Sequence, residues 1–62
     1  MEVRVDDSQF VSTWGKHPSG LDNWVFQIGR YLYNFRGTYR LCVSAARLTA
    51  IDAGVTVVAV MP

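Results

Sequence analysis

Hydrophobic and aromatic side chains alternate with other residues along positions 23–35, a pattern typical of a β-hairpin. Folding this stretch about Gly29 and Arg30 places six large side chains on one face of the hairpin: Trp24, Phe26, Ile28, Tyr31, Tyr33 and Phe35. Glycine at the first turn position suits a type II′ turn, which would pair Ile28 with Tyr31. An apolar sheet face of this size needs a second layer of structure to cover it.

The segment that follows the hairpin supplies that layer as a predicted helix over residues 39–53. Thr38 is a suitable N-cap, and Gly54 is a suitable C-terminal stop. At helical spacing, one side of this segment carries small residues: Cys42, Ala45, Ala46, Thr49 and Ala53. A helix face made of small side chains complements a sheet face made of large ones.

Two further strands are predicted at the ends of the chain. Residues 55–61 are apolar in both alternating sets, which is typical of a central strand that is buried on both faces. Val3 and Val5 alternate with polar residues and indicate a short N-terminal strand over residues 1–5. The second sheet face would then be covered by the N-terminal segment, with Phe10, Val11 and Trp14, or by a second copy of the protein.

These elements predict an α+β fold, in which a small antiparallel sheet is covered on one face by the single helix 39–53. Antiparallel pairing is expected throughout, because short antiparallel sheets dominate small α+β domains. The 62 residues form one small domain. Within it, residues 1–22 make an N-terminal strand and loop segment, with a short helical turn over 9–14, and residues 23–62 make the hairpin–helix–strand core.

The composition limits which crosslinks or bound groups could stabilise the chain. Half of the residues are hydrophobic, which argues against disorder. The single cysteine, Cys42, excludes an internal disulfide, and no Cys/His cluster has the spacing of a metal site. We therefore expect no metal and no cofactor. The lone cysteine and the lack of a charged start followed by an apolar run predict a cytoplasmic protein.

Charge is distributed unevenly along the chain. Residues 1–22 carry a net charge of −2, and residues 23–62 carry a net charge of +3. The cations of the second segment are all arginine, namely Arg30, Arg36, Arg40 and Arg47. Such a stripe is consistent with nucleic-acid binding, although a net charge of +3 is well below that of typical nucleic-acid-binding domains. A solvated basic face is the simpler interpretation.

Several residues have the chemistry of catalytic groups without the expected arrangement. His17 lies near Ser12, Ser19 and Asp22 in sequence, but these residues share one loop with no scaffold to fix their geometry. The glycine-rich loop 15–20 places its lysine before the second glycine, unlike a P-loop. We therefore expect no enzymatic activity.

The remaining candidate reactive groups have structural interpretations. Asp6 and Asp7 are adjacent and should point apart, so a helix-capping role is simpler than shared-proton chemistry. Cys42 lies on the small apolar side of the predicted helix and is expected to be an inert, buried thiol. The hairpin aromatics could stack nucleic-acid bases, but the helix needs them as its packing surface.

Trp14 is the aromatic residue with no assigned place in the core. It lies beside the glycine-rich loop, and large aromatic and arginine side chains are enriched at protein interfaces. The predicted contact residues for a partner are therefore Trp14, Lys16, Arg40 and Arg47. The alternative is that Trp14 covers the open face of the sheet.

Residues 19–62 resemble short proteins of phages and mobile elements that form a hairpin–helix–strand domain. The resemblance is carried by residues in every element of that segment: Gly20, Asn23, Trp24, Val25, Phe26, Phe35, Gly37, Thr38, Tyr39, Ala46, Ala50, Ala53, Gly54 and residues 57–62. Most of those proteins have unknown function, so no functional residue carries over. The resemblance implies a mobile-element origin.

Taken with the negative evidence for a catalytic site, the sequence predicts a non-enzymatic protein-binding module. Its partner would be a host or defence protein, one of whose surfaces it occupies. Two alternatives remain open: nucleic-acid binding through the arginine stripe, and self-association that buries the second sheet face in a homodimer.

Overall fold

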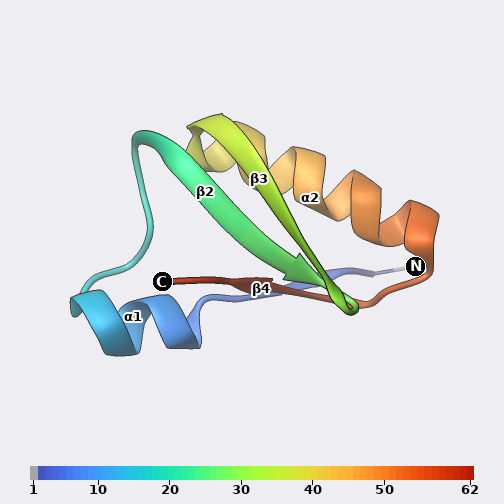
Figure 1. Ribbon diagram of the computed structural model, residues 1–62, viewed down its shortest axis with the longest axis horizontal. Helices are drawn as coiled ribbons and strands as arrows, with labels where there is room; N and C mark the ends of the chain where they lie inside the picture. The colour runs from blue at the N-terminus through green and yellow to red at the C-terminus, as the bar shows by residue number, and fades with distance from the viewer. Residues whose placement is uncertain (1) are drawn as a thin grey trace.

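The computed structural model describes residues 2–62 and consists of one four-stranded sheet with two helices (Figure 1). In chain order the elements are β1 (Arg4–Asp6), α1 (Ser8–Trp14), β2 (Leu21–Ile28), β3 (Tyr31–Thr38), α2 (Tyr39–Ala53) and β4 (Val57–Val60). This arrangement confirms the predicted α+β class and the short N-terminal helix. One end of the predicted first strand, Met1, lies outside the described residues.

The β2–β3 hairpin has the predicted register. Ile28 pairs with Tyr31, Phe26 with Tyr33 and Trp24 with Phe35, while the strands extend to the pair of Leu21 and Thr38. The hairpin is therefore longer than the predicted 23–35. Gly29 adopts a φ of 64°, a left-handed conformation that glycine tolerates without strain, so it can occupy the first turn position.

Helix α2 has the predicted bounds and both predicted caps. The Thr38 hydroxyl accepts a hydrogen bond from the Leu41 backbone N–H at 3.4 Å. Gly54 has a left-handed φ of 72° and its N–H bonds the carbonyl groups that the helix end leaves free. The N–H of Val55 also bonds the Ala50 carbonyl at 2.8 Å. The Val55 N–H is thereby held at the helix end, and β4 spans Val57–Val60 instead of the predicted 55–61.

Strand order in the sheet is β1-β4-β2-β3, so β4 is central, as predicted. It pairs with β2 in the antiparallel sense, but β1 pairs with β4 in the parallel sense, with Val5 opposite Val58. The prediction of antiparallel pairing throughout is therefore wrong. The alternation of Val3 and Val5 turns the same side chains to the core in either strand direction, so the pattern cannot determine that direction.

The core lies between α2 and one face of the sheet. Four large sheet side chains are fully buried there: Phe26, Ile28, Val58 and Val60. They meet the small α2 residues Cys42, Ala46 and Ala50, which are also buried. The predicted complementarity of small helix residues and large sheet residues is confirmed, but the predicted helix face was wrong at Ala53, which is exposed, and omitted the buried Ala50. Because α2 connects β3 to β4 with β2 between them, its path crosses this face (Figure 1).

The opposite face of the sheet is largely open. Its members Leu32 and Val57 are 63% and 38% exposed, and Gln27 is exposed as well. Helix α1 packs at one end of the sheet, where Phe10 contacts the buried Trp24 at a ring-centroid distance of 5.6 Å. The N-terminal segment, one of the two candidate covers, therefore does not cover the second face, and the prediction that β4 is buried on both faces is wrong. Seven residues make a helix too short to span a sheet of this width.

Candidate functional site

A cavity of about 380 Å³ lies at the end of the sheet next to α1. Four segments contribute to it: α1, the loop 15–20, the start of β2 and the C-terminal end that follows β4. Its lining is Phe10, Trp14, Lys16, His17, Ser19, Asp22, Asn23, Trp24, Val25, Met61 and Pro62. The cavity therefore combines an aromatic wall with a polar rim.

The aromatic wall is built outward from the core. Trp24 is 5% exposed, and its indole Nε1–H donates to the Gly20 carbonyl at 3.1 Å, which anchors the loop to β2. Phe10 packs on Trp24, and Trp14 lies one helical turn further along α1 with its ring centroid 6.3 Å from that of Phe10. Trp14 is 59% exposed, so it ends this aromatic row at the solvent.

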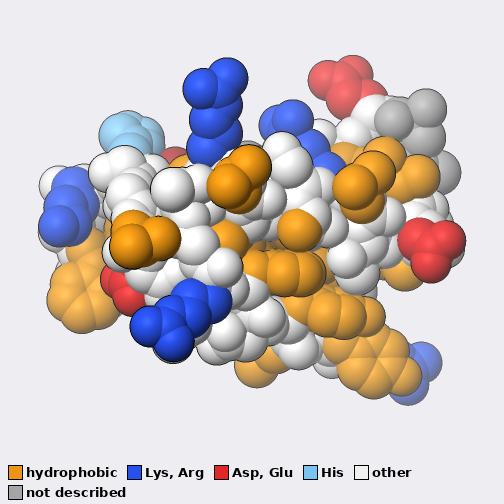
Figure 2. All heavy atoms as spheres, turned by 90° about the horizontal axis from the view of Figure 1, so that it is seen from above, with side chains coloured by type: hydrophobic (Ala, Val, Ile, Leu, Met, Phe, Trp, Pro, Cys, Tyr) orange, Lys and Arg blue, Asp and Glu red, His pale blue; other side chains and the backbone are white. Residues whose placement is uncertain are grey.

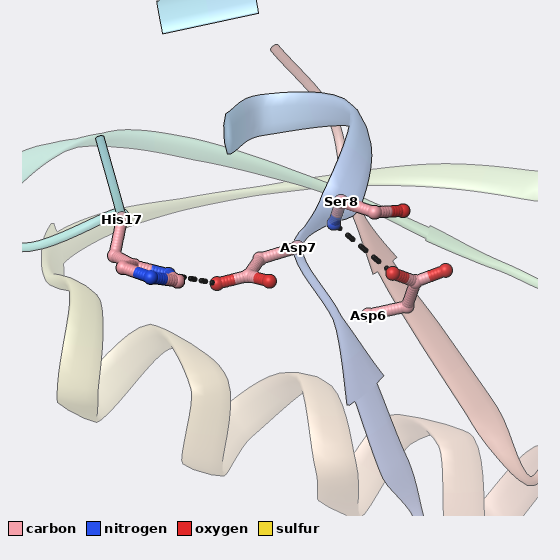
Figure 3. A network of polar contacts seen from close by, with 4 residues as sticks. All are labelled: Asp6, Asp7, Ser8 and His17. Atoms are coloured by element: carbon pink, nitrogen blue, oxygen red, sulfur yellow. Dashed lines mark hydrogen bonds and ion pairs between the residues drawn. The ribbon is translucent and has the colours of Figure 1, made fainter. Parts of the chain in front are cut away.

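The polar side of the cavity is organised by two aspartates. Asp22 accepts a hydrogen bond from the Asn23 backbone N–H at 2.7 Å. On the other side of the loop, the His17 Nδ1 lies 3.0 Å from the Asp7 carboxylate, as Figure 3 shows. This contact joins loop 15–20 to the residue that precedes α1. The His17 side chain is itself 82% exposed.

Asp6 and Asp7 point in different directions (Figure 3), as predicted. The Asp6 carboxylate accepts the Ser8 backbone N–H at 3.0 Å, and this bond lowers the pKa of Asp6. Asp6 thereby serves the start of α1, although Asp7 occupies the N-cap position and makes no side-chain cap bond. The two carboxylates serve separate contacts and do not form an acid–base pair.

Two of the four predicted contact residues lie at the cavity, and two do not. Trp14 and Lys16 line it, whereas Arg40 and Arg47 extend from the exposed side of α2. The pKa of Tyr39 is raised, first by burial and then by the charge of Asp7. The positive charge of Arg47 partly opposes this rise. The four residues therefore do not form one site.

Sequence reasoning missed the apolar members of the cavity. Val25 lies in β2 and Met61 directly follows β4, and no local sequence pattern links either residue to Phe10. The bond from the Met61 N–H to the Val25 carbonyl at 2.9 Å brings these segments together. The one sequence feature that pointed to the cavity was the position of Trp14 directly before a glycine-rich loop.

Basic and apolar side chains are arranged differently on the face that α2 and β3 form. Figure 2 shows hydrophobic side chains in a band across this face, while the basic side chains stand apart from one another. Arg30 lies in the hairpin turn, Arg36 lies in β3, and the other two arginines lie in α2. The predicted arginine stripe is therefore dispersed over three elements.

The ingredients of nucleophilic catalysis are not assembled. Within residues 2–62, no hydrogen bond joins His17 to Ser12, Ser19 or Asp22. Cys42 is buried, as predicted, and its Sγ–H donates to the Phe35 carbonyl at 3.5 Å. No group of three or more His, Cys, Asp or Glu side chains in the described part of the chain is placed to hold a metal ion.

None of the helices in the described chain is both long enough and apolar enough to cross a membrane.

No protein-family model matches the chain, and no curated protein or solved structure matches it.

Proposed function

We propose that this protein is a non-enzymatic protein-binding module, and that the cavity bordered by Trp14 and Lys16 receives a side chain of its partner. The observation that carries the proposal is the exposure of Trp14, at 59%, on the rim of a cavity with an aromatic wall. The resemblance to phage and mobile-element proteins favours a host or defence protein as the partner.

The energetics favour a binding role for Trp14 over a packing role. A tryptophan that remains largely in water contributes little of its apolar area to folding. The same ring contributes strongly once a partner removes it from water, and tryptophan is enriched among residues that dominate interface energies. Lys16 beside it offers a charge that would select an acidic or polar group on the partner.

Affinity selection with a displayed library of random peptides tests the proposal and does not require the natural partner. We expect a consensus that combines an apolar side chain for the aromatic wall with an acidic residue for Lys16. A synthetic peptide of that consensus should bind saturably, and Trp14→Ala should weaken binding at least about tenfold, the scale of an interface hot spot.

Leu48→Ala is the matched control, because Leu48 is an exposed apolar residue on α2 and does not line the cavity. It should leave peptide affinity unchanged. Failure to select any consensus, or equal loss of affinity in the Trp14→Ala and Leu48→Ala variants, would contradict the proposal.

Titration with single- and double-stranded nucleic acid distinguishes the alternative function. Binding whose logarithmic affinity falls linearly with the logarithm of salt concentration would indicate phosphate neutralisation by the arginines. We expect no saturable binding near physiological salt, because the arginines are dispersed over three elements. A steep salt dependence whose slope falls by about one in an Arg36→Gln variant would favour nucleic acid over a protein partner.

A further inference from the structure

The two edges of the sheet are protected to very different degrees. Edge strand β1 has three residues, of which Arg4 and Asp6 are charged. Edge strand β3 has eight residues, pairs with β2 without a bulge and contains no proline. Short length, charge, bulges and proline are the features that stop an edge strand from pairing with another chain. Of these, β3 has only the single charge of Arg36.

We propose that β3 pairs with β3 of a second copy of this chain, in an antiparallel arrangement that joins the two sheets into one. In an antiparallel ladder, successive residues direct their backbone groups alternately toward one neighbour and the other. Every second residue of β3 therefore presents its N–H and C=O groups outward. Because a two-residue turn closes on a hydrogen-bonded pair, we expect this outward set to be Leu32, Asn34 and Arg36.

One register uses the strand fully, with Asn34 of each copy opposite the other on the two-fold axis. Residues 31–37 of both copies then pair along their whole length. A two-residue slip toward the turn would place Arg36 opposite Arg30 of the second copy, and opposed like charges are unfavourable. The centred register instead places Arg36 opposite Leu32 of the second copy.

The side chains on the helix-covered face complement one another in this register. Tyr33 and Phe35 of one copy are half-buried and already stack on each other, with ring centroids 6.4 Å apart and an interplanar angle of 12°. Pairing places Tyr33 opposite Phe35 of the second copy, which continues the aromatic row across the axis. Aromatic cross-strand pairs stabilise sheets beyond the backbone bonds.

The outermost pair in this register brings the first residue of one β3 strand opposite the last part of the other. Tyr31 is 62% exposed in the single chain and would lie opposite Gly37 of the second copy. An aromatic ring that packs over a glycine in the facing strand covers backbone that the glycine leaves bare. The register therefore gives the most exposed aromatic residue of β3 a defined packing site.

Sedimentation equilibrium over a wide concentration range tests the pairing directly. We expect a reversible monomer–dimer equilibrium for the unmodified protein. Asn34→Lys places two positive charges opposite each other at the axis and should weaken dimerisation at least about tenfold. An equimolar mixture of N34K and N34D should recover dimer, because opposite charges then face each other. Protein that stays monomeric up to the solubility limit would overturn the proposal.

Gln27→Lys is the matched control, because Gln27 is exposed on the same sheet face but lies in the inner strand β2. It should leave the dimer unchanged. Equal weakening by Q27K and N34K would instead indicate face-to-face association and overturn edge pairing. Hydrogen exchange gives a second readout. Protection of the Leu32, Asn34 and Arg36 amides should rise with protein concentration, and protection that is independent of concentration would contradict edge pairing.

Discussion

The two faces of the sheet use similar residues for different purposes. On the face beneath α2, Phe26 and Val60 are fully buried against alanines, whereas Leu21 and Leu32 on the other face are 79% and 63% exposed. Apolar area removed from water stabilises the fold, and apolar area left in water does not. The buried side chains of the first face therefore hold the domain together, whereas the leucines of the second face remain in contact with water.

The two faces differ in exposure because only one helix is long enough to cover a face of the sheet. One 15-residue helix, α2, covers one face, and the seven-residue α1 reaches only the end of the sheet. Within residues 2–62 no third helix is present to cover the second face. The second face therefore remains open, but exposed polar side chains such as Gln27 and Asn34 share it with Leu32, so the proposed partner sites are the cavity beside Trp14 and the edge of β3.

The largest effect is expected on the covered face. Phe26→Ala removes a fully buried ring and should lower the free energy of unfolding by about 3–5 kcal/mol. A domain of this length has a total stability of only about 3–9 kcal/mol, so the variant should lose a large part of its stability. Urea denaturation followed by circular dichroism measures the change. A variant with wild-type stability would contradict the core assignment.

A smaller loss is expected where β3 passes into α2. Thr38→Ala removes the hydroxyl that accepts the Leu41 N–H and should cost about 1 kcal/mol. Thr38→Ser keeps a capping hydroxyl and serves as the control, so it should retain most of the stability. The same denaturation experiment checks both variants. If T38S loses as much stability as T38A, the hydroxyl is not the stabilising group.

A pH-dependent effect is expected from Tyr39, which lies at the boundary between the core and solvent. Burial raises the pKa of Tyr39 above its ordinary value, so the folded state retains a proton that the unfolded state releases. Its contribution to stability is complete below the unfolded pKa of about 10 and declines as pH rises through the folded pKa. Tyr39→Phe should therefore flatten the fall in unfolding free energy at alkaline pH.

The control for that measurement is Tyr31→Phe, because Tyr31 is exposed at the hairpin end. It should leave the alkaline slope as it is in the wild type. A slope that is unaltered by Y39F would show that Tyr39 is not the group responsible.

The smallest effect is expected on the open face. Leu21→Ala changes an exposed side chain and should alter the unfolding free energy by no more than about 0.5 kcal/mol. Measured beside Phe26→Ala in the same strand, it gives the contrast between the faces directly. A loss of several kcal/mol would mean that the face described as open is covered in solution.

The elements that sequence alone could predict are those determined by neighbouring residues. The register about Gly29 and the helix between Thr38 and Gly54 follow from turn, cap and periodicity signals within one segment. The direction of β1 relative to β4 is determined by pairing between residues at opposite ends of the chain, and a three-residue strand contains no signal for it. Similarly, the cavity requires Phe10, Val25 and Met61 to converge from distant segments.

We propose that Trp14 serves binding and contributes little to folding. The most direct test measures two quantities on one Trp14→Ala preparation: the free energy of unfolding and the affinity for the selected peptide. We predict a stability loss of about 1 kcal/mol or less, because Trp14 is 59% exposed, together with at least about a tenfold loss of affinity. A large loss of stability with unchanged peptide affinity would contradict a binding role for Trp14.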